Sequence, residues 1–115
     1  MIKISFIGFG NMAKAIAHQL QKTGLFSLSA AAPSLKPGVY QEDINTYTDN
    51  KQVIQDADII ILAVKPSQMK SVLDEISPLL PKECLLISLA AGLHLDWFSQ
   101  ILGSKQALIR TMPNT

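Results

Sequence analysis

Two glycines and an alanine near the N-terminus stand at a fixed spacing between a strand-like and a helix-like segment. Gly8, Gly10 and Ala13 fill the pattern G-x-G-x-x-A directly after the apolar run 3–7. In such a turn the first glycine permits the bend, the second lets a pyrophosphate approach the backbone, and the alanine allows close packing. The following helix adds N–H donors and the positive end of its dipole. We predict a dinucleotide-binding turn; a glycine turn needed only for packing is the alternative.

The segment after the second apolar run carries a hydroxyl and a cation where related folds carry an acid. Dinucleotide folds that prefer NAD place Asp or Glu there, to accept a hydrogen bond from the ribose 2′-OH. Here Ser34 and Lys36 follow Pro33, and the first acidic residue is Glu42. A hydroxyl and a cation suit a 2′-phosphate, so we predict NADPH as the cofactor. The alternative is that Lys36 is a solvated loop lysine.

Three further segments follow apolar runs at points where a ligand could bind. They are 63–66 (Ala-Val-Lys-Pro), 88–92 (Ser-Leu-Ala-Ala-Gly) and 110–115 (Arg-Thr-Met-Pro-Asn-Thr). In open α/β sheets, ligands bind outside the carboxyl ends of the strands. This places Lys65 for contact with a ligand, whereas the other two segments, taken alone, are typical of ordinary loops.

The elements that must position these segments alternate along the chain. Continuous apolar runs predict strands at 3–7, 27–32, 58–64, 85–89 and 107–112. Helical spacing predicts helices from Asn11 to a stop at Gly24, at 50–56, from an N-cap at Ser67 through Leu80, and from a cap at Asp96 through Leu102. Residues 34–48 have no clean period. The alternation predicts an α/β, Rossmann-like doubly wound, mostly parallel sheet with helices on both faces.

Length and composition exclude several classes of protein. The 115 residues suit one domain, and 48% hydrophobic against 17% charged residues is too apolar for a disordered chain. The net charge is +1 without clustered basic residues, which argues against nucleic-acid binding. No apolar run approaches the length of a membrane span. No secretory signal is visible, so we expect a cytoplasmic protein. The single Cys84 offers neither a disulfide nor a metal-binding spacing, and we expect it to be buried.

Together these segments resemble one family. Residues 6–13 (Phe-Ile-Gly-Phe-Gly-Asn-Met-Ala), 63–66, 90–92 and 110–115 match, in order, the N-terminal dinucleotide-binding domain of pyrroline-5-carboxylate reductases. The resemblance covers essentially the whole chain, and the Met-Pro-Asn-Thr ending is its most specific part. It implies NAD(P)H-dependent reduction of the C=N bond of 1-pyrroline-5-carboxylate to L-proline, with members of the family using either cofactor.

The resemblance also implies a role for individual residues. The pyrophosphate would lie on Ile7, Gly8, Phe9, Gly10, Asn11 and Met12, and the adenosine end on Ser34, Lys36 and Asn50. The nicotinamide would lie against Ala63, Val64, Lys65, Pro66, Leu89, Ala90 and Ala91, with Pro113 and Asn114 near the reacting ring. The family's second, helical domain forms a homo-oligomer and holds the substrate carboxylate. Residues 1–115 lack it, so we expect the cofactor half of an enzyme, with no catalytic residue and no metal site.

Two alternatives remain open at this stage. A β-hydroxyacid dehydrogenase-type reductase shares the glycine turn followed by Asn-Met, although the 63–66 and 113–115 segments weigh against it. A nucleotide-sensing module without catalysis would keep the cofactor turn and need no substrate half.

Overall fold

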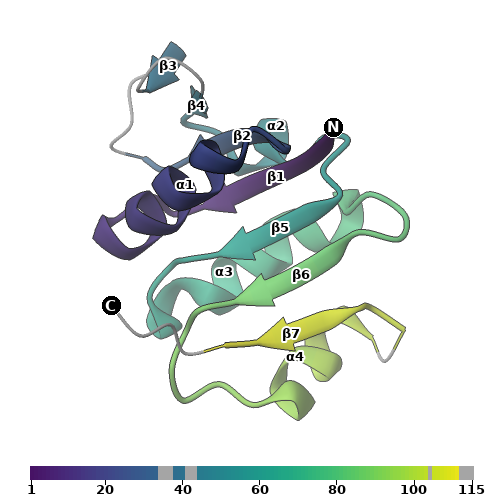
Figure 1. The fold of residues 1–115 in the computed structure, drawn as a ribbon. Coiled ribbons are helices and arrows are strands. Elements are labelled where there is room, and N and C mark those ends of the chain that lie inside the picture. The colour runs from purple at the N-terminus through teal and green to yellow at the C-terminus, as the bar shows by residue number, and fades with distance from the viewer. Residues whose placement is uncertain (34–37, 41–43, 104, 112–115) are drawn as a thin grey trace.

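The computed structural model describes residues 1–33, 38–40, 44–103 and 105–111. Within them, seven strands form one sheet in the order β3-β4-β2-β1-β5-β6-β7 (Figure 1). The strands are β1 (Ile2–Ile7), β2 (Phe26–Ala31), β3 (Gly38–Tyr40), β4 (Ile44–Tyr47), β5 (Ile59–Leu62), β6 (Leu85–Ser88) and β7 (Leu108–Arg110). The helices are α1 (Asn11–Thr23), α2 (Asn50–Val53), α3 (Pro66–Ile76), the 3-10 turn η1 (Ser77–Leu79) and α4 (Leu95–Leu102). All strand pairs are parallel except β3 with β4. The predicted fold class is confirmed.

The direction in which strands are added reverses at the middle of the sheet. From β1 the chain adds β2 and β4 on one side, then returns to add β5, β6 and β7 on the other. Right-handed crossovers therefore place α1 on one face and α2, α3 and α4 on the opposite face, as Figure 1 shows. The reversal lies between β1 and β5, where their carboxyl ends diverge and leave room for a ligand.

Each face of the sheet carries its own apolar cluster. Under α1, the buried side chains include Phe6, Leu28 and Ile61, together with Ala13 and Ala17 of the helix. The opposite cluster is centred on Met69, Leu73 and Ile76 of α3 and Phe98 of α4.

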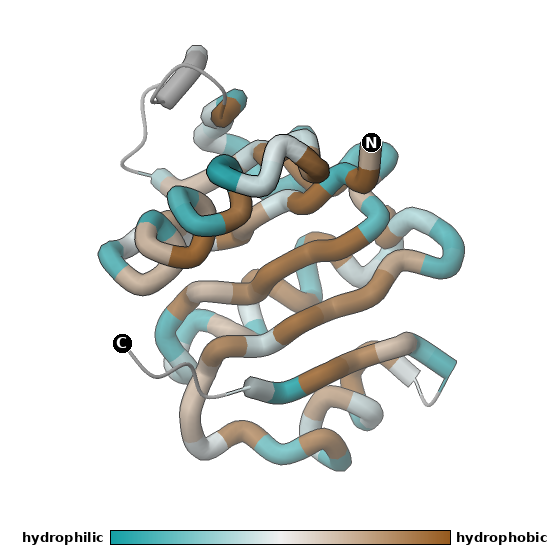
Figure 2. Tube along the Cα trace, viewed as in Figure 1, coloured by the Kyte–Doolittle hydropathy of each residue, from teal (hydrophilic) through white to brown (hydrophobic). Residues whose placement is uncertain are grey.

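The central strands β5 and β6 are apolar along their length, and Figure 2 shows them as nearly continuous hydrophobic bands. On the face that packs against α3, Ile60 and Leu62 are fully buried. On the opposite face, Ile59 and Ile87 are half-buried. The continuous apolar run explains why 59–62 was predictable as a strand.

Several helix boundaries differ from the sequence prediction. Lys65, not Ser67, is the N-cap of α3, because Pro66 occupies the first helical position, which suits its fixed φ. Pro78 sits in η1, which ends the regular helix at Ile76 and leaves Leu79 52% exposed. His94, not Asp96, is the N-cap of α4.

The hairpin of β3 and β4 lies within residues 34–48, for which we made no prediction from the sequence. β4 pairs with β2 in parallel and with β3 in antiparallel register. Ile44 and Thr46 are buried while Asn45 is exposed, a strand pattern only two alternations long. Such a short pattern is decided by its neighbours in the sheet and not by its own periodicity.

The burial expected for Cys84 is confirmed, and two aromatic residues of α4 pack in or against the same core. Cys84 is buried, and the side-chain amide of Gln106 donates to its carbonyl oxygen at 2.8 Å. Phe98 is fully buried and packs edge-on against Trp97, with ring centroids 5.0 Å apart.

In the described part of the chain, no helix is both long and apolar enough to cross a membrane. The described residues also bring together no group of His, Cys, Asp or Glu that could hold a metal ion.

Candidate functional site

The turn between β1 and α1 ends in a helix N-terminus without a side-chain cap. Gly8 has φ +88°, and its N–H donates to the carbonyl oxygen of Ala31 at 2.8 Å, which anchors the turn to β2. Gly10 is the N-cap residue of α1 and has no side chain that could accept from the first amides of the helix. The first turn of α1 also contains no acidic residue. Its N–H groups and dipole are therefore available to an anion.

The two glycines of the turn differ in their surroundings. A Cβ on Gly8 would lie 2.7 Å from the carbonyl oxygen of Ala63, so this glycine is required by the contact between the turn and β5. A Cβ on Gly10 would meet nothing within 4 Å. The backbone at Gly10 thus faces open space, which is the condition for close approach of a phosphate group.

A cavity of about 600 Å³ opens beside Gly10. Its walls are the glycine turn, the ends of β2 and β5, the start of α2 and the first turns of α3. It is lined by Ile7, Gly8, Gly10, Ala31, Ala32, Pro33, Asn50, Ala63, Val64, Lys65, Ser67, Gln68, Ser71 and Val72. It therefore brings together seven predicted site residues from three separate segments of the sequence: Ile7, Gly8, Gly10, Asn50, Ala63, Val64 and Lys65.

A second cavity, of about 300 Å³, adjoins the first. It runs from the start of α1 across the end of β5 to the end of β6. It is lined by Gly10, Asn11, Met12, Ala13, Ala63, Val64, Lys65, Pro66, Leu89, Ala90 and Ala91. Gly10, Ala63, Val64 and Lys65 line both cavities, so we treat the two as one cleft, called here the crossover cleft.

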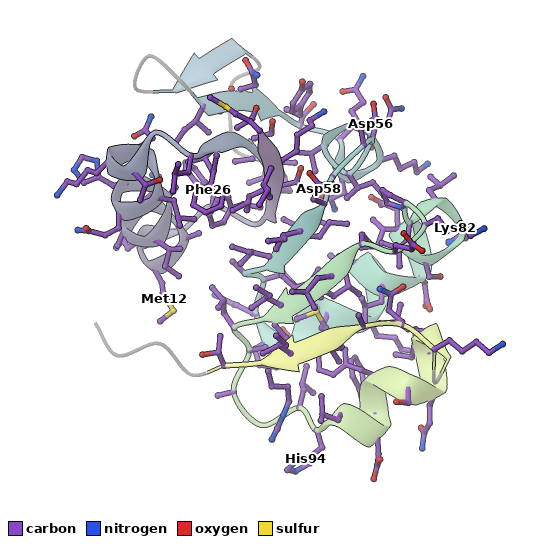
Figure 3. All side chains as sticks on the ribbon, turned by 45° about the vertical axis from the view of Figure 1, so that its right-hand side comes forward. Met12, Phe26, Asp56, Asp58, Lys82 and His94 are labelled. Atoms are coloured by element: carbon purple, nitrogen blue, oxygen red, sulfur yellow. The ribbon has the colours of Figure 1, made fainter. Side chains whose placement is uncertain are left out.

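The charges around the crossover cleft favour an anionic ligand. The described residues that line it include no Asp or Glu, and Lys65 is an exposed cation common to both halves. Asp58 lies at the opposite, amino end of the strands, where its carboxylate accepts from the Lys3 N–H at 2.8 Å. Figure 3 shows Met12 at the carboxyl end of the sheet, far from Asp56 and Asp58. The phosphates of a dinucleotide would meet N–H donors and a cation, with no carboxylate in the lining.

The side chain of one predicted residue lies outside the cleft. Phe9 is 6% exposed, and its ring packs edge-on against Phe6 at 5.8 Å in the core under α1. Only its main chain is left for contact with a ligand. Four further predictions, Ser34, Lys36, Pro113 and Asn114, fall outside the described residues.

The larger cavity also has a polar wall that was not predicted from the sequence. Ser67, Gln68 and Ser71 of α3 line it together with Val72. The sequence shows only that these residues belong to the first turns of a helix that follows a strand end, and that they lie off its buried stripe of Met69 and Leu73. The side of that helix that faces the cleft depends on how the crossover places the helix on the sheet, and this cannot be inferred from the local sequence.

The sequence of the chain matches a known family over most of its length. Residues 3–92 match the family described as NADP oxidoreductase, coenzyme F420-dependent. The chain belongs to this family. It is 40% identical over 119 residues to the pyrroline-5-carboxylate reductase of Escherichia coli, covering 98% of this chain and 44% of that protein. It is 34% identical to the Pseudomonas aeruginosa enzyme of the same name, covering 98% and 43%. The chain thus spans less than half the length of these relatives.

Solved structures of the same enzymes share the fold. The Plasmodium falciparum pyrroline carboxylate reductase, solved with NADP bound, superposes with a TM-score of 0.85 at 34% identity, over 98% of this chain and 42% of that one. The Coxiella burnetii pyrroline-5-carboxylate reductase gives the same TM-score and identity, over 97% and 44%. A diketoreductase (16% identical) and a glycerol-3-phosphate dehydrogenase (17%) share the fold alone.

Proposed function

We propose that the chain is the cofactor-binding part of a pyrroline-5-carboxylate reductase, an enzyme that reduces 1-pyrroline-5-carboxylate to L-proline with NAD(P)H. One observation carries this proposal. The crossover cleft, which has no acidic residue in its described lining, meets the uncapped N-terminus of α1 in a chain that is 40% identical along its length to such an enzyme. A relative of the same fold was solved with NADP bound.

The cleft supports an order of contacts along the cofactor. The pyrophosphate would lie at Gly10, Asn11 and Met12, where the backbone is open and the helix amides are uncapped. The adenosine end would occupy the larger cavity, beside Asn50 and the polar wall of Ser67, Gln68 and Ser71. The nicotinamide end would occupy the smaller cavity, where short side chains leave room for a flat ring. We also propose contacts from Ser34 and Lys36 to the adenosine end and from Pro113 and Asn114 near the reacting ring.

The part that these residues play in the reaction is to bind and orient. A bound nicotinamide cofactor supplies the hydride that reduces the C=N carbon. Ala63, Ala90 and Ala91 would fix the plane of the ring and cover one of its faces, so that a substrate can approach only the other. Lys65 would hold negative charge near the junction of the two cavities. Such positioning can lower a barrier by about 7–11 kcal/mol, provided that the reacting atoms are held in contact.

The substrate side of the reaction requires more than this chain. We propose that the half of the protein which the relatives possess beyond the matched part holds the substrate carboxylate and forms the homo-oligomer, and that the enzyme acts in the cytoplasm. The described lining of the cleft contains no Asp or Glu that could protonate the imine nitrogen, and we propose that this proton also comes from the further half of the protein.

Two measurements test the proposal. Calorimetry of the chain with NADPH should give saturable binding, which Gly10→Val abolishes while the circular dichroism spectrum stays unchanged. A protein extended to the length of the relatives should oxidise NADPH when 1-pyrroline-5-carboxylate is added. Binding without that activity would favour a nucleotide-sensing module, and activity on β-hydroxyacids alone would favour the dehydrogenase alternative. Absence of binding would refute the cofactor site itself.

A further inference from the structure

The wall of the nicotinamide side of the crossover cleft is an irregular segment between β6 and α4. Its first part, Leu89 to Ala91, lines the smaller cavity. The Leu89 N–H donates to the Leu62 carbonyl oxygen at 3.0 Å, and the Ala90 N–H donates to the buried Ser88 hydroxyl at 3.2 Å. These bonds fix the beginning of the segment to β5 and β6. Beyond them the chain passes through Gly92, at φ +82°, before α4 begins.

The far part of this segment is held by a side chain from the edge strand. The guanidinium Nη1 of Arg110, the last residue of β7, donates to the carbonyl oxygen of Leu93 at 2.7 Å. The same Nη1 lies 3.4 Å from Nδ1 of His94. β7 is itself fixed to β6, since the Thr111 N–H donates to the Ser88 carbonyl oxygen at 2.9 Å. Arg110 therefore spans from the sheet to the far end of the cavity wall.

The same arginine also borders open space next to that wall. A cavity of about 360 Å³ is lined by Ala90, Ala91, Gly92, Arg110 and Thr111. Ala90 is buried and Leu93 packs against the core, whereas Ala91 and Gly92 between them are exposed. This short exposed stretch has few apolar contacts of its own, so its position depends on the hydrogen bonds on either side of it.

We propose that Arg110 is a positioning residue for the nicotinamide half of the cofactor, acting through the Leu93 carbonyl oxygen on the wall formed by Ala90 and Ala91. This inference rests on the proposed function of the cleft. Arg110 borders neither cavity of the cleft, so it acts without touching the cofactor there. A charge-assisted hydrogen bond to a backbone carbonyl can hold a loop in one position, and an apolar side chain of similar length cannot replace it.

The test compares two ligands that differ only in the nicotinamide ring. NADPH and 2′-phospho-ADP-ribose are titrated into the wild-type chain and into Arg110→Met, His94→Ala and Lys82→Met. Lys82→Met is the matched control, because like Arg110→Met it replaces a positively charged side chain by methionine. Lys82 lies at the amino end of the strands, away from His94 (Figure 3). The measured quantity is the ratio of the two dissociation constants for each protein, because a general loss of stability weakens both ligands together.

We expect Arg110→Met to reduce the preference for NADPH by about three- to tenfold, as loss of one partly exposed charged hydrogen bond would. Its affinity for 2′-phospho-ADP-ribose should stay at the wild-type value, which also shows that the variant is folded. His94→Ala and Lys82→Met should keep the wild-type ratio. An unchanged ratio in Arg110→Met, or an equal loss in His94→Ala, would overturn the inference. Failure of the wild-type chain to bind either ligand would instead overturn the proposed function, and the inference with it.

Discussion

The carbonyl oxygen of Ala63 occupies the place that a side chain on Gly8 would need. A Cβ on Gly8 would lie 2.7 Å from that oxygen and 2.9 Å from the carbonyl carbon. The contact joins the glycine turn after β1 to the end of β5, the two strands between which the sheet order reverses. The opening of the crossover cleft is therefore set by a backbone contact that only glycine allows.

Gly8→Ala should destabilise the fold. The methyl group would collide with backbone, which cannot move aside as a flexible side chain can, and φ +88° is a strained conformation for alanine. Strain and overpacking together predict a loss of about 2–5 kcal/mol in the free energy of unfolding. Urea denaturation followed by circular dichroism measures this loss. A variant as stable as the wild type would show that the turn and β5 separate without cost.

Gly10→Val should have the opposite profile: little change in stability and loss of cofactor binding. Gly10 has φ −78°, a conformation open to any residue, and a Cβ there meets nothing within 4 Å. Replacing an N-cap glycine by valine costs about 1 kcal/mol. The branched side chain would fill the space in front of the first amides of α1, where we place the pyrophosphate.

Gly10→Ala is the graded control for that prediction, since its smaller methyl group should weaken binding less than valine does. Both variants are compared with the wild type by calorimetry with NADPH. Full affinity in a folded Gly10→Val protein would mean that the glycine serves the fold alone.

The helices and strands that could be predicted from the sequence are those with the longest regular apolar patterns. β5 and the buried stripe of α3 were predictable because long apolar patterns have few alternatives. The hairpin of β3 and β4 was not, because β4 (Ile44–Tyr47) is a strand by virtue of its pairing with β2. The predictions that Ser67 and Asp96 are N-caps were wrong. At α3, Pro66 is the first helical residue, so the helix begins one residue before Ser67, the predicted cap.

Residues of the candidate site were predictable where the backbone conformation requires a particular residue type. They were not predictable where the packing of helices on the sheet determines which side chains face the cleft. The G-x-G spacing identifies both glycines in the sequence: the backbone requires glycine at Gly8, and only the proposed pyrophosphate requires it at Gly10. Ser67 and Ser71 have no local feature that separates them from other exposed serines, because only the crossover turns their helix face toward the cleft. The burial of the Phe9 side chain could not be predicted from the sequence either, because neighbouring residues of one turn point to opposite sides.

Cys84 should make the stability of the protein fall at alkaline pH. Burial raises the pKa of its thiol, against a smaller opposing effect of the Gln106 hydrogen bond. The folded protein thus holds the proton more tightly than the unfolded chain does. This contribution is fully present below the ordinary pKa of a thiol and is lost as the pH rises through the raised value.

The measurement is the free energy of unfolding from about pH 7 to pH 10, around the ordinary thiol pKa. The comparison is with Cys84→Ala, in which all other titrating groups are retained. The variant should have a flatter alkaline slope. Parallel curves would mean that the thiol ionises equally well in both states.

The chain alone should not reduce 1-pyrroline-5-carboxylate at a useful rate. It spans 44% of the E. coli relative, and we place the substrate-binding residues in the part of the relatives that it does not span. Positioning of the reactants can lower the barrier by about 7–11 kcal/mol. Without it, the chain should lose nearly all of the activity. The assay is proline formation by the purified chain with NADPH, beside a protein of the relatives' length. Robust turnover by the chain alone would place the substrate site within these residues.

The chain should bind NADPH more tightly than NADH. The acid that would bond a ribose 2′-OH is missing after the second strand, and Ser34 and Lys36 follow it in the sequence. A 2′-phosphate carries up to two negative charges, which a nearby cation attracts and a carboxylate would repel. A charge-assisted hydrogen bond is worth about 1.5–3 kcal/mol, and because salt screens such charges we expect the lower end, about tenfold in affinity. Titrations of both cofactors at low and moderate salt, on the wild type and Lys36→Ala, measure the preference. A preference that survives Lys36→Ala unchanged would assign recognition of the phosphate to other residues.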